Sequence, residues 1–368
     1  MERILEKEKT LLVDGPASIT VLAGKLEIFG FQARKNHKII IREGKRLPFT
    51  ASEPTRILIS LGANTKIEEI NGSSIPTSWD STIEGLWQIK KKPITIMVIG
   101  EVDTGKTSFC TYLTNKLVNK NFQVGVLDED LGQSDIGPPG AIAYSYVSFP
   151  ITDIFDLETE NAIFLGTTTP VEATNKIIEA TVLLKTQMIK KCQLDFLIIN
   201  TDGWLADENA INFKIHLAEA LEVDMIFWIQ NTNKNTINTT FEAALPNINH
   251  RIIESSSLVS HRNWEKRRKI RENTYINYLK NAKIKNYPSY SIAIKGNLQA
   301  LYDRRAENLV VGIYDQQDKF LGIGKICKVD YYSKILKILS KIVEKPKFIV
   351  IGKIRLDDNL HEISSEFS

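Results

Sequence analysis

The feature that most constrains the fold is the segment of residues 100–107, which reads Gly-Glu-Val-Asp-Thr-Gly-Lys-Thr and fits the spacing G-x-x-x-x-G-K-[ST]. A continuous apolar run at residues 94–99 comes directly before it, and residues 106–120 have a helical pattern. In this order of strand, loop and helix, backbone N–H groups and the helix N-terminus bind phosphate. The alternative, a turn that matches the spacing by chance, is disfavoured by the flanking strand and helix. The sequence therefore predicts a P-loop.

Nucleotide contacts are expected along this loop and into the first turn of the helix. Lys106 can reach the β- and γ-phosphates, and the Thr107 hydroxyl can ligate Mg²⁺. A guanine-reading N-K-x-D motif is absent, because residues 230–236 read Gln-Asn-Thr-Asn-Lys-Asn-Thr, with no aspartate at the required offset. We therefore expect ATP and Mg²⁺ as cofactors. The residues expected to contact the nucleotide are Gly100, Glu101, Val102, Asp103, Thr104, Gly105, Lys106, Thr107 and Ser108.

Short apolar runs alternate with segments of helical pattern through the middle of the chain, which predicts a parallel sheet covered by helices on both faces. Strands are expected at residues 94–99, 122–127, 195–200 and 223–229, and helices at 106–120, 172–191 and 207–221. Short β-rich runs separated by turn residues come before this region, and a β pattern returns from about residue 287. We expect an α/β fold with a central P-loop NTPase domain between small N-terminal and C-terminal β domains. The expected domains are residues 1–90, 91–285 and 286–368.

Composition excludes several classes of protein. The net charge of +3 is too small to indicate nucleic-acid binding by itself, so any basic surface must be local. The three cysteines are far apart and offer neither a zinc spacing nor a disulfide framework, as is usual in a reducing compartment. The N-terminus is charged, and the apolar runs are too short to cross a bilayer. We expect a cytoplasmic protein without a membrane segment.

An acidic segment follows the next apolar strand after the P-loop. Asp128, Glu129 and Asp130 come directly after residues 122–127, and Gln133 follows them. Carboxylates at the carboxyl end of a strand beside a P-loop are suited to binding Mg²⁺ or to activating a hydroxyl. The alternative is a solvated acidic turn. We expect Asp128 and Asp130, with Thr107, to hold the metal, and Gln133 to contact substrate.

Three further segments are candidates for binding the acceptor. Residues 166–170 read Gly-Thr-Thr-Thr-Pro, a hydroxyl-rich loop of the kind that contacts phosphates but also forms plain turns. Trp204 follows a strand at the edge of the sheet where ligands collect, so its indole can stack on a base or simply pack in the core. Residues 261–271 form the densest positive run. If this run is helical, Arg267 and Arg271 share one face, which would neutralise phosphate charge or remain a solvated surface.

These motifs together resemble those of the polynucleotide 5′-hydroxyl kinases of archaea and eukaryotes. That family includes the RNA kinase of the mRNA 3′-end cleavage machinery and the nucleolar kinase of ribosomal RNA processing. The matching segments lie in the family's order along almost the whole chain: an N-terminal signature at residues 22–30, the P-loop, a D-x-D-x-G-Q box at 128–133, a clasp loop at 166–170, a G-W element at 200–204 and an R-x-x-x-x-R lid at Arg262 and Arg267. The clasp departs from the family pattern at residues 171–175, where its Thr-Asn pair comes two residues later.

The resemblance implies a role for each matching residue. Lys106 and Thr107 would hold the phosphates and Mg²⁺, and Asp130 would activate the acceptor 5′-hydroxyl. Arg262 and Arg267 would stabilise the transferring phosphoryl group, and Trp204 would stack on the terminal nucleotide. The expected catalytic residues are Lys106, Asp130, Arg262 and Arg267, and the expected substrate contacts are Gln133, Thr168, Thr169 and Trp204.

The function expected on this basis is transfer of the γ-phosphate of ATP to the 5′-OH end of RNA, DNA or both. The main alternative is an ATP-binding scaffold subunit of an RNA-processing complex with little or no catalysis. A P-loop ATPase or small-molecule kinase is a third possibility. The sequence leaves the choice between RNA and DNA and the identity of protein partners open.

Overall fold

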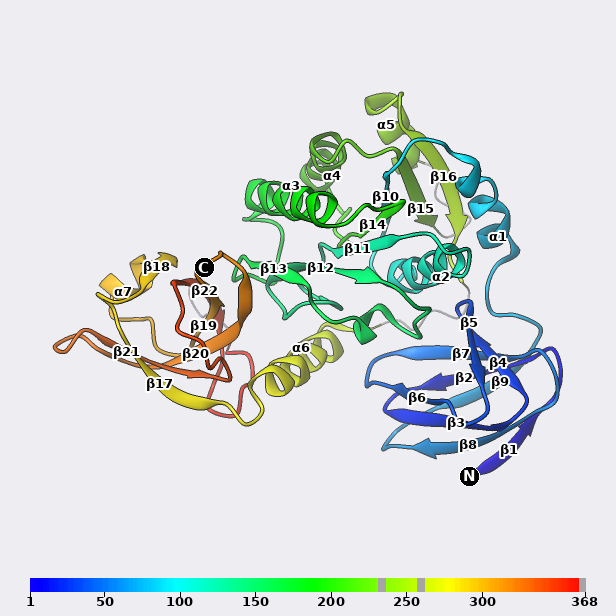
Figure 1. The fold of residues 1–368 in the computed structure, drawn as a ribbon, viewed down its shortest axis with the longest axis horizontal. Coiled ribbons are helices and arrows are strands. Elements are labelled where there is room, and N and C mark those ends of the chain that lie inside the picture. The colour runs from blue at the N-terminus through cyan, green and yellow to red at the C-terminus, as the bar shows by residue number, and fades with distance from the viewer. Residues whose placement is uncertain (231–235, 257–261, 364–368) are drawn as a thin grey trace. The chain divides into compact units, whose positions relative to one another are not determined.

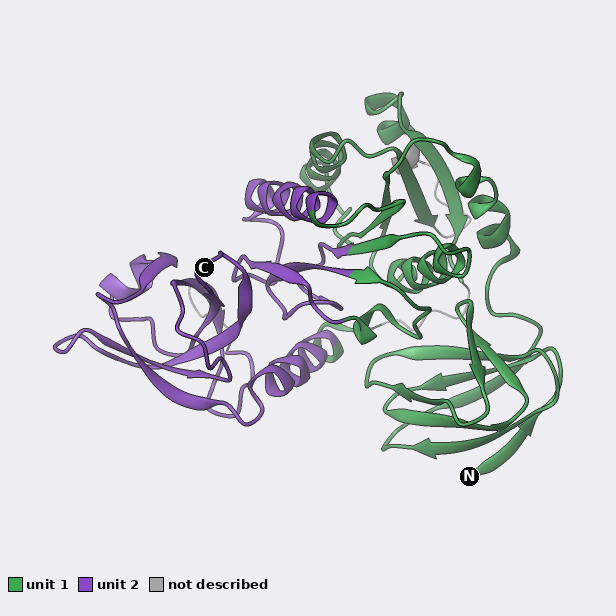
Figure 2. Ribbon diagram, in the orientation of Figure 1, with its two compact units in different colours: residues 1–126, 146–157, 191–266 green, residues 127–145, 158–190, 267–368 purple. Residues whose placement is uncertain are grey.

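The protein is described by a computed structural model that covers residues 1–230, 236–256 and 262–363 (Figure 1). The chain divides into two compact units, each built from segments that are distant in sequence (Figure 2). Unit 1 consists of residues 1–126, 146–157 and 191–266. Unit 2 consists of residues 127–145, 158–190 and 267–368. Among the described residues, none of the helices has the length and hydropathy required to span a bilayer.

The N-terminal part of unit 1 contains two antiparallel sheets. Alternation in β8 (Thr55–Leu61) shows how the sequence builds them, since Ile57 and Ile59 are buried whereas Arg56 and Leu58 are exposed. One sheet has the order β1-β8-β3-β6 and the other the order β5-β4-β7-β2-β9. The remaining strands are β1 (Glu2–Leu5), β2 (Lys9–Asp14), β3 (Ala17–Ala23), β4 (Lys25–Ile28), β5 (Phe31–Arg34), β6 (Lys38–Ile41), β7 (Arg46–Ala51) and β9 (Ile67–Asn71).

A seven-stranded sheet carries the P-loop, in the order β13-β12-β11-β14-β10-β15-β16. Its strand β10 (Ile94–Gly100) is buried at every position and pairs in parallel with β14 and β15, as continuous apolar strands predict. The expectation of a wholly parallel sheet is wrong at one edge, where β12 and β13 are antiparallel. The other strands are β11 (Val124–Asp128), β12 (Ala141–Val147), β13 (Asn161–Phe164), β14 (Phe196–Asn200), β15 (Met225–Gln230) and β16 (Asn249–Glu254).

The helices lie close to the bounds that the apolar periodicity predicts. Helix α2 (Lys106–Val118) begins at the end of the P-loop and packs on β10 and β14. Asp207 caps α4 (Glu208–Ala220) by accepting a hydrogen bond from the Ala210 N–H at 2.9 Å. The other helices are α1 (Thr77–Ile83), η1 (Leu86–Gln88), η2 (Ile154–Asp156), α3 (Thr174–Lys191), α5 (Thr236–Ala244), α6 (Trp264–Leu279) and α7 (Gln299–Tyr302).

Unit 2 ends in a six-stranded sheet with the order β17-β21-β20-β19-β22-β18. Its apolar core includes Ala306, Val311 and Ile338, none of which is exposed to solvent. The strands are β17 (Lys283–Pro288), β18 (Ala293–Gly296), β19 (Leu309–Tyr314), β20 (Phe320–Asp330), β21 (Ile335–Ser340) and β22 (Phe348–Arg355). The expected fold class is confirmed: an α/β fold in which, along the chain, the P-loop sheet comes after the N-terminal β sheets and before the C-terminal β sheet. The boundaries proposed for the three domains stay predictions.

Candidate active site

The P-loop has the backbone conformation that its sequence predicts. Gly105 has φ +95° and forms the N-cap of α2, and Asp103 is also in the left-handed region, with φ +57°. Gly100 has no room for a side chain, because a Cβ there would lie 2.6 Å from the Ile229 carbonyl oxygen. Ser255 at the end of β16 donates its hydroxyl to the Thr104 carbonyl at 2.8 Å. The loop is therefore bonded to the residue that follows β16 and lies close against the end of β15.

Lys106 lies under the loop with 8% of its surface exposed. Its ammonium group donates hydrogen bonds to the carbonyl oxygens of Gly100 at 2.9 Å and Glu101 at 2.8 Å. Thr107 and Ser108 are half-buried in the first turn of α2. A helix N-terminus with a lysine in its first turn is an electrostatic environment that favours an anion such as phosphate.

The two residues expected to form the lid differ in their surroundings. Arg262, in unit 1, binds the carboxylate of Asp103 in the P-loop. Its backbone N–H donates to Asp103 Oδ2 at 2.8 Å, and its Nε donates to Oδ1 at 3.2 Å. The Asp103 side chain is only 4% exposed, which strengthens this pairing relative to one on the surface. Arg262 therefore contacts the phosphate loop through Asp103.

Trp204, also in unit 1, is held in a loop that packs directly on the P-loop. Its backbone N–H donates to Asp202 Oδ1 at 2.7 Å, and its indole Nε1 donates to Asp207 Oδ2 at 3.3 Å. A Cβ on the preceding Gly203 would lie 2.6 to 2.8 Å from the Cγ2, Cα and N atoms of Val102. Glycine is therefore required there, since the two loops approach each other through their backbones.

The acidic segment belongs to unit 2 from residue 127 onward, and each of its two aspartates is oriented by the chain that follows. Asp128 is fully buried, and its Oδ2 accepts hydrogen bonds from the backbone N–H groups of Asp135 at 2.6 Å and Ile136 at 3.3 Å. Asp130 Oδ1 accepts from the N–H groups of Gly132 at 2.9 Å and Gln133 at 2.8 Å. These turns fix the direction of both carboxylates.

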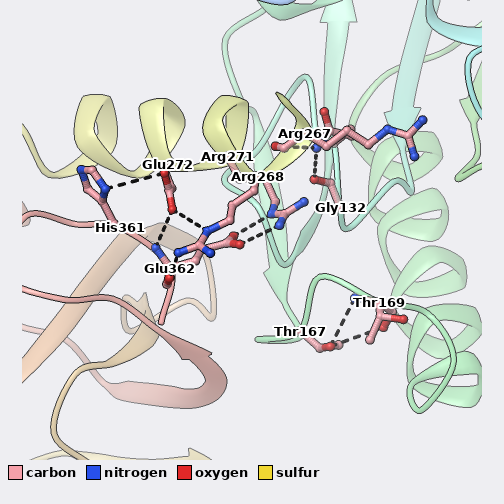
Figure 3. A network of polar contacts seen from close by, with 10 residues as sticks. Gly132, Thr167, Thr169, Arg267, Arg268, Arg271, Glu272, His361 and Glu362 are labelled. Carbon is pink, nitrogen blue, oxygen red and sulfur yellow. Dashed lines mark hydrogen bonds and ion pairs between the residues drawn. The ribbon is translucent and has the colours of Figure 1, made fainter. Parts of the chain in front are cut away.

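The hydroxyl-rich loop lies against the acidic segment within unit 2. A Cβ on Gly132 would approach the Thr168 carbonyl oxygen to 3.0 Å. Thr167 and Thr169 form a local turn in which the Thr169 N–H donates to Thr167 Oγ1 at 3.3 Å (Figure 3). Thr174 and Asn175, the displaced pair of the clasp pattern, form the start of α3. The clasp loop and the acidic box are thus neighbours within unit 2.

The basic run is helical from Trp264 onward, as part of α6, and the arginines of this helix do not form one free cationic face. Arg271 binds both carboxylate oxygens of Glu362 at 2.6 Å, and Arg268 binds Glu272 Oε1 at 2.9 Å and the Glu362 carbonyl (Figure 3). Burial is the largest influence and lowers the pKa of Arg271, but the hydrogen bond to Glu362 and the negative charges of Glu362 and Glu272 together raise it above its ordinary value. Arg267 extends away from this cluster (Figure 3), and its carbonyl oxygen accepts from Gln133 Nε2 at 3.2 Å.

Each unit therefore gathers part of the expected site. Unit 1 brings the P-loop, Arg262 and Trp204 together, and unit 2 brings the acidic box, the clasp loop and Arg267 together. His261 and residues 231–235, where a guanine-reading motif would lie, are outside the described residues. Within the described residues no group of three or more His, Cys, Asp or Glu side chains is arranged to hold a metal ion.

One residue of this site was not anticipated from the sequence. Lys214 of α4 is fully buried and donates to Asp202 Oδ2 at 2.7 Å. The sequence contains a signal for its burial. Lys214 lies four residues after Ala210 and four before Ala218, and both alanines are buried on the same helix face. A lysine in such an apolar row indicates a buried partner for its charge.

Comparisons with known proteins agree with the motifs. Residues 100–281 match the family described as mRNA cleavage and polyadenylation factor CLP1 P-loop. A polyribonucleotide 5′-hydroxyl-kinase of Methanocaldococcus jannaschii is 25% identical over 330 residues, which cover 74% of this chain and 90% of the relative. One from Pyrococcus abyssi is 29% identical over 328 residues, with the same coverage of 74% and 90%. The Clp1 polyribonucleotide 5′-hydroxyl-kinase of Gallus gallus is 25% identical over 242 residues, 60% of this chain and 56% of the relative.

A solved structure has the same fold. The structure of a wild-type Clp1p–Pcf11p complex superposes with a TM-score of 0.78 and covers 96% of this chain and 97% of that chain. Its sequence identity is 16%, so the likeness concerns the fold alone. Because that superposition spans nearly the whole chain, it extends beyond the segment that the P-loop family covers.

Proposed function

We propose that this chain, whose residues 100–281 belong to the CLP1 P-loop family, is a polynucleotide 5′-hydroxyl kinase that transfers the γ-phosphate of ATP to the 5′-OH end of RNA, DNA or both. The curated relatives from Methanocaldococcus jannaschii and Pyrococcus abyssi are named polyribonucleotide 5′-hydroxyl-kinases, which favours RNA. The observation that carries the proposal is the contact of the Trp204 loop with the P-loop through Gly203 and Val102. Trp204, whose ring can stack on a base, directly follows the glycine that approaches the P-loop.

On the nucleotide side, the P-loop amides, Lys106 and the N-terminus of α2 would bind the triphosphate. Lys106 can exchange its two carbonyl partners for phosphate oxygens, which are stronger acceptors because they are charged. Asp103 and Arg262 would fix the shape of the loop. Phosphoryl transfer requires mainly positioning and neutralisation of charge, so this preorganised loop supplies most of what unit 1 contributes.

On the acceptor side, Asp130 would accept the proton of the 5′-hydroxyl. One of its oxygens is held by two backbone N–H groups, which leaves the orientation of the other determined by the turn. Gln133 Oε1 is buried and has no hydrogen-bond partner in the described part of the chain, so it offers an acceptor for a substrate donor. Thr168 and Thr169 would contact the substrate, and Arg267 would stabilise the transferring phosphoryl group.

Mg²⁺ fits this set of residues. Magnesium is usually held by one or two carboxylates together with substrate phosphates and waters, so a cluster of three acidic side chains is not required. Thr107, Asp128 and Asp130 are the proposed ligands, and the ion would neutralise charge on the transferring group. The cytoplasmic location also stays a prediction.

The test is transfer of labelled phosphate from ATP to matched 5′-OH RNA and DNA oligonucleotides, with Lys106→Ala as the control. We expect transfer by the wild-type protein, a preference for one of the two acceptors, and loss of transfer in the variant. ATP retained by the protein with no transfer to any oligonucleotide would favour the scaffold alternative. Transfer to nucleosides in preference to oligonucleotides would indicate a small-molecule kinase instead.

A further inference from the structure

The buried ion pair between Lys214 and Asp202 is the feature of unit 1 that the proposed reaction leaves unexplained. The Lys214 side chain is 0% exposed and that of Asp202 is 9% exposed, with 2.7 Å between Lys214 Nζ and Asp202 Oδ2. Removing two charges from water is costly, and well-packed apolar residues of similar volume are often at least as stabilising. The pair is therefore poor evidence of a contribution to stability. The role of the pair must therefore lie in the residues that it holds in position.

The carboxylate of Asp202 links α4 to the tryptophan loop. While Oδ2 binds Lys214, Oδ1 accepts a hydrogen bond from the Trp204 backbone N–H at 2.7 Å. A lysine on a rigid helix thus fixes the carboxylate, and the carboxylate fixes the backbone that carries the indole.

The indole has a second attachment to the same helix. Its Nε1 donates to Asp207 Oδ2 at 3.3 Å, while Asp207 Oδ1 caps the first turn of α4. The ring also lies 6.1 Å from Phe213 of α4, measured between centroids, with 31° between the two planes. Both the backbone and the side chain of Trp204 are therefore held in place by α4 and its N-cap.

The same loop is in contact with the phosphate loop. Gly203 lies between Asp202 and Trp204, and its backbone approaches Val102 too closely for any side chain. A shift of the loop away from α4 would change the distance between the indole and the P-loop. Reacting groups held about 1 Å out of place can cost roughly 100-fold in rate.

We propose that Lys214 is a positioning residue, and that the Lys214–Asp202 pair holds Trp204 at a fixed place beside the P-loop so that the terminal base stacks in register with the bound phosphates. This inference rests on the proposed kinase function. It adds a residue of α4 that touches neither nucleotide nor acceptor. Lys214 would act on acceptor binding through Trp204, and ATP binding by the P-loop would not depend on it.

The first experiment needs no activity. The chain has five tryptophans, so incorporation of 5-fluorotryptophan gives five ¹⁹F resonances, and Trp204→Phe identifies the one from Trp204. In Lys214→Met we expect this resonance alone to shift and broaden. Lys325→Met is the matched control, because Lys325 is another buried lysine bonded to an aspartate, Asp358, but in unit 2. An unchanged Trp204 resonance in Lys214→Met would refute the proposal whether or not the protein is a kinase.

The second experiment uses steady-state kinetics of the full-length protein. Lys214→Met should raise the KM for a 5′-OH oligonucleotide by roughly 10-fold to 100-fold while the KM for ATP stays unchanged. Adding Lys214→Met to Trp204→Phe should have almost no further effect, because residues that act through one another are not additive. Additive losses, or equal losses in both KM values, would show that Lys214 has only a structural role. If Lys214→Met fails to fold, the double variant Asp202→Asn with Lys214→Met, which removes both charges, replaces it.

No transfer by the wild-type protein would overturn the proposed function, and the ¹⁹F result would still decide whether Lys214 positions Trp204. The two conclusions can therefore fail independently.

Discussion

The two arginines of the lid pattern, Arg262 and Arg267, have different partners and should have different roles. The guanidinium of Arg262 binds Asp103, whose carboxylate is almost fully buried in the P-loop. Arg267 is the first residue of the third segment of unit 2, and it extends away from the ion pairs formed by Arg268 and Arg271 (Figure 3). The pattern R-x-x-x-x-R alone suggests equal functions for its two members. The contacts of Arg262 fit a role through the shape of the P-loop, whereas the action of Arg267 on the transferring group stays a prediction.

Replacing Arg267 by alanine should mainly lower kcat. An arginine that stabilises the charge of a transferring phosphoryl group is worth roughly 10³ to 10⁵ in rate, and it makes this contribution in the transition state. We expect a loss of at least roughly 10³-fold in kcat with a modest change in the KM for ATP. The measurement is labelled phosphate transfer to a 5′-OH oligonucleotide. Unchanged turnover would remove Arg267 from the mechanism.

Replacing Arg262 by alanine should mainly weaken ATP binding. The substitution removes the guanidinium contacts to Asp103 Oδ1 and keeps the backbone N–H bond to Oδ2, so the P-loop loses one of the constraints on its conformation. We expect the KM for ATP to rise roughly tenfold, about 1.4 kcal/mol, with a smaller change in kcat. Arg262→Lys should raise the KM for ATP by an intermediate amount, since lysine keeps the positive charge but lacks the planar guanidinium. A loss in kcat equal to that of Arg267→Ala, with an unchanged KM, would place Arg262 on the phosphoryl group instead.

Single residues also show where sequence reasoning ends. Lys106 and Thr107 could be placed because the P-loop ties local spacing to one conformation. The partner of Lys214 could not, since it lies twelve residues away in a loop whose path depends on how β14 and α4 pack. The contact between Arg262 and Asp103 joins residues 159 positions apart, and a pairing of that kind is a property of tertiary structure.

At the scale of elements, helix α6 is attached to the last described residues of the chain. The carboxylate of Glu362 accepts two hydrogen bonds from the Arg271 guanidinium, and its carbonyl oxygen accepts one from Arg268. Its backbone N–H donates to Glu272 Oε1 at 3.0 Å. The helix that begins just before Arg267 thus depends on a segment about ninety residues away. The run of positive residues predicted a cationic surface. The sequence did not indicate that carboxylates neutralise two of its arginines.

The variant Glu362→Ala should therefore destabilise unit 2. The side chains of Arg271 and Glu362 are 11% and 15% exposed, and removing one partner of a buried pair typically costs about 3 to 5 kcal/mol. We expect the free energy of unfolding, measured in urea, to decrease by an amount that approaches this cost. Glu172→Ala is the control, because its pair with Lys353 is exposed on both sides and its loss should be undetectable. Equal effects of the two substitutions would contradict the role given to Glu362.

Strands were harder to predict than helices for a physical reason. Strand β10 could be identified because a run of apolar residues before a P-loop must be buried. Strand β12 (Ala141–Val147) was missed, and it includes small and polar residues such as Ala141 and Ser145 that give no clear alternation. It pairs antiparallel with β13, with Ala141–Tyr144 opposite Asn161–Phe164, a register that the sequence of either strand alone does not indicate.

At the scale of the whole molecule, the C-terminal sheet packs directly on an earlier segment of unit 2, and the contacting residues are more than 140 positions apart in the sequence. The Phe164 N–H donates to the Tyr314 hydroxyl at 2.7 Å, and a Cβ on Gly312 would lie 2.6 Å from Phe164 Cβ. The Gly166 carbonyl accepts from the Lys353 N–H at 2.7 Å. The clasp loop thus begins on a residue that is bonded to β22. Sequence reasoning placed a boundary between residues 285 and 286, which stays a prediction that truncation can test.

A chain that ends at residue 285 should lose the clasp loop even if the P-loop still forms. Without β19 and β22, the Phe164 ring and the Gly166 backbone lose the surfaces against which they pack. We expect the truncated chain to lose phosphate transfer to oligonucleotides while unit 1 keeps ATP binding, measured by calorimetry. Gly312→Val in the full chain should act in the same direction, since its side chain would collide with Phe164. A truncated chain with full kinase activity would show instead that residues 286–368 form a separable domain.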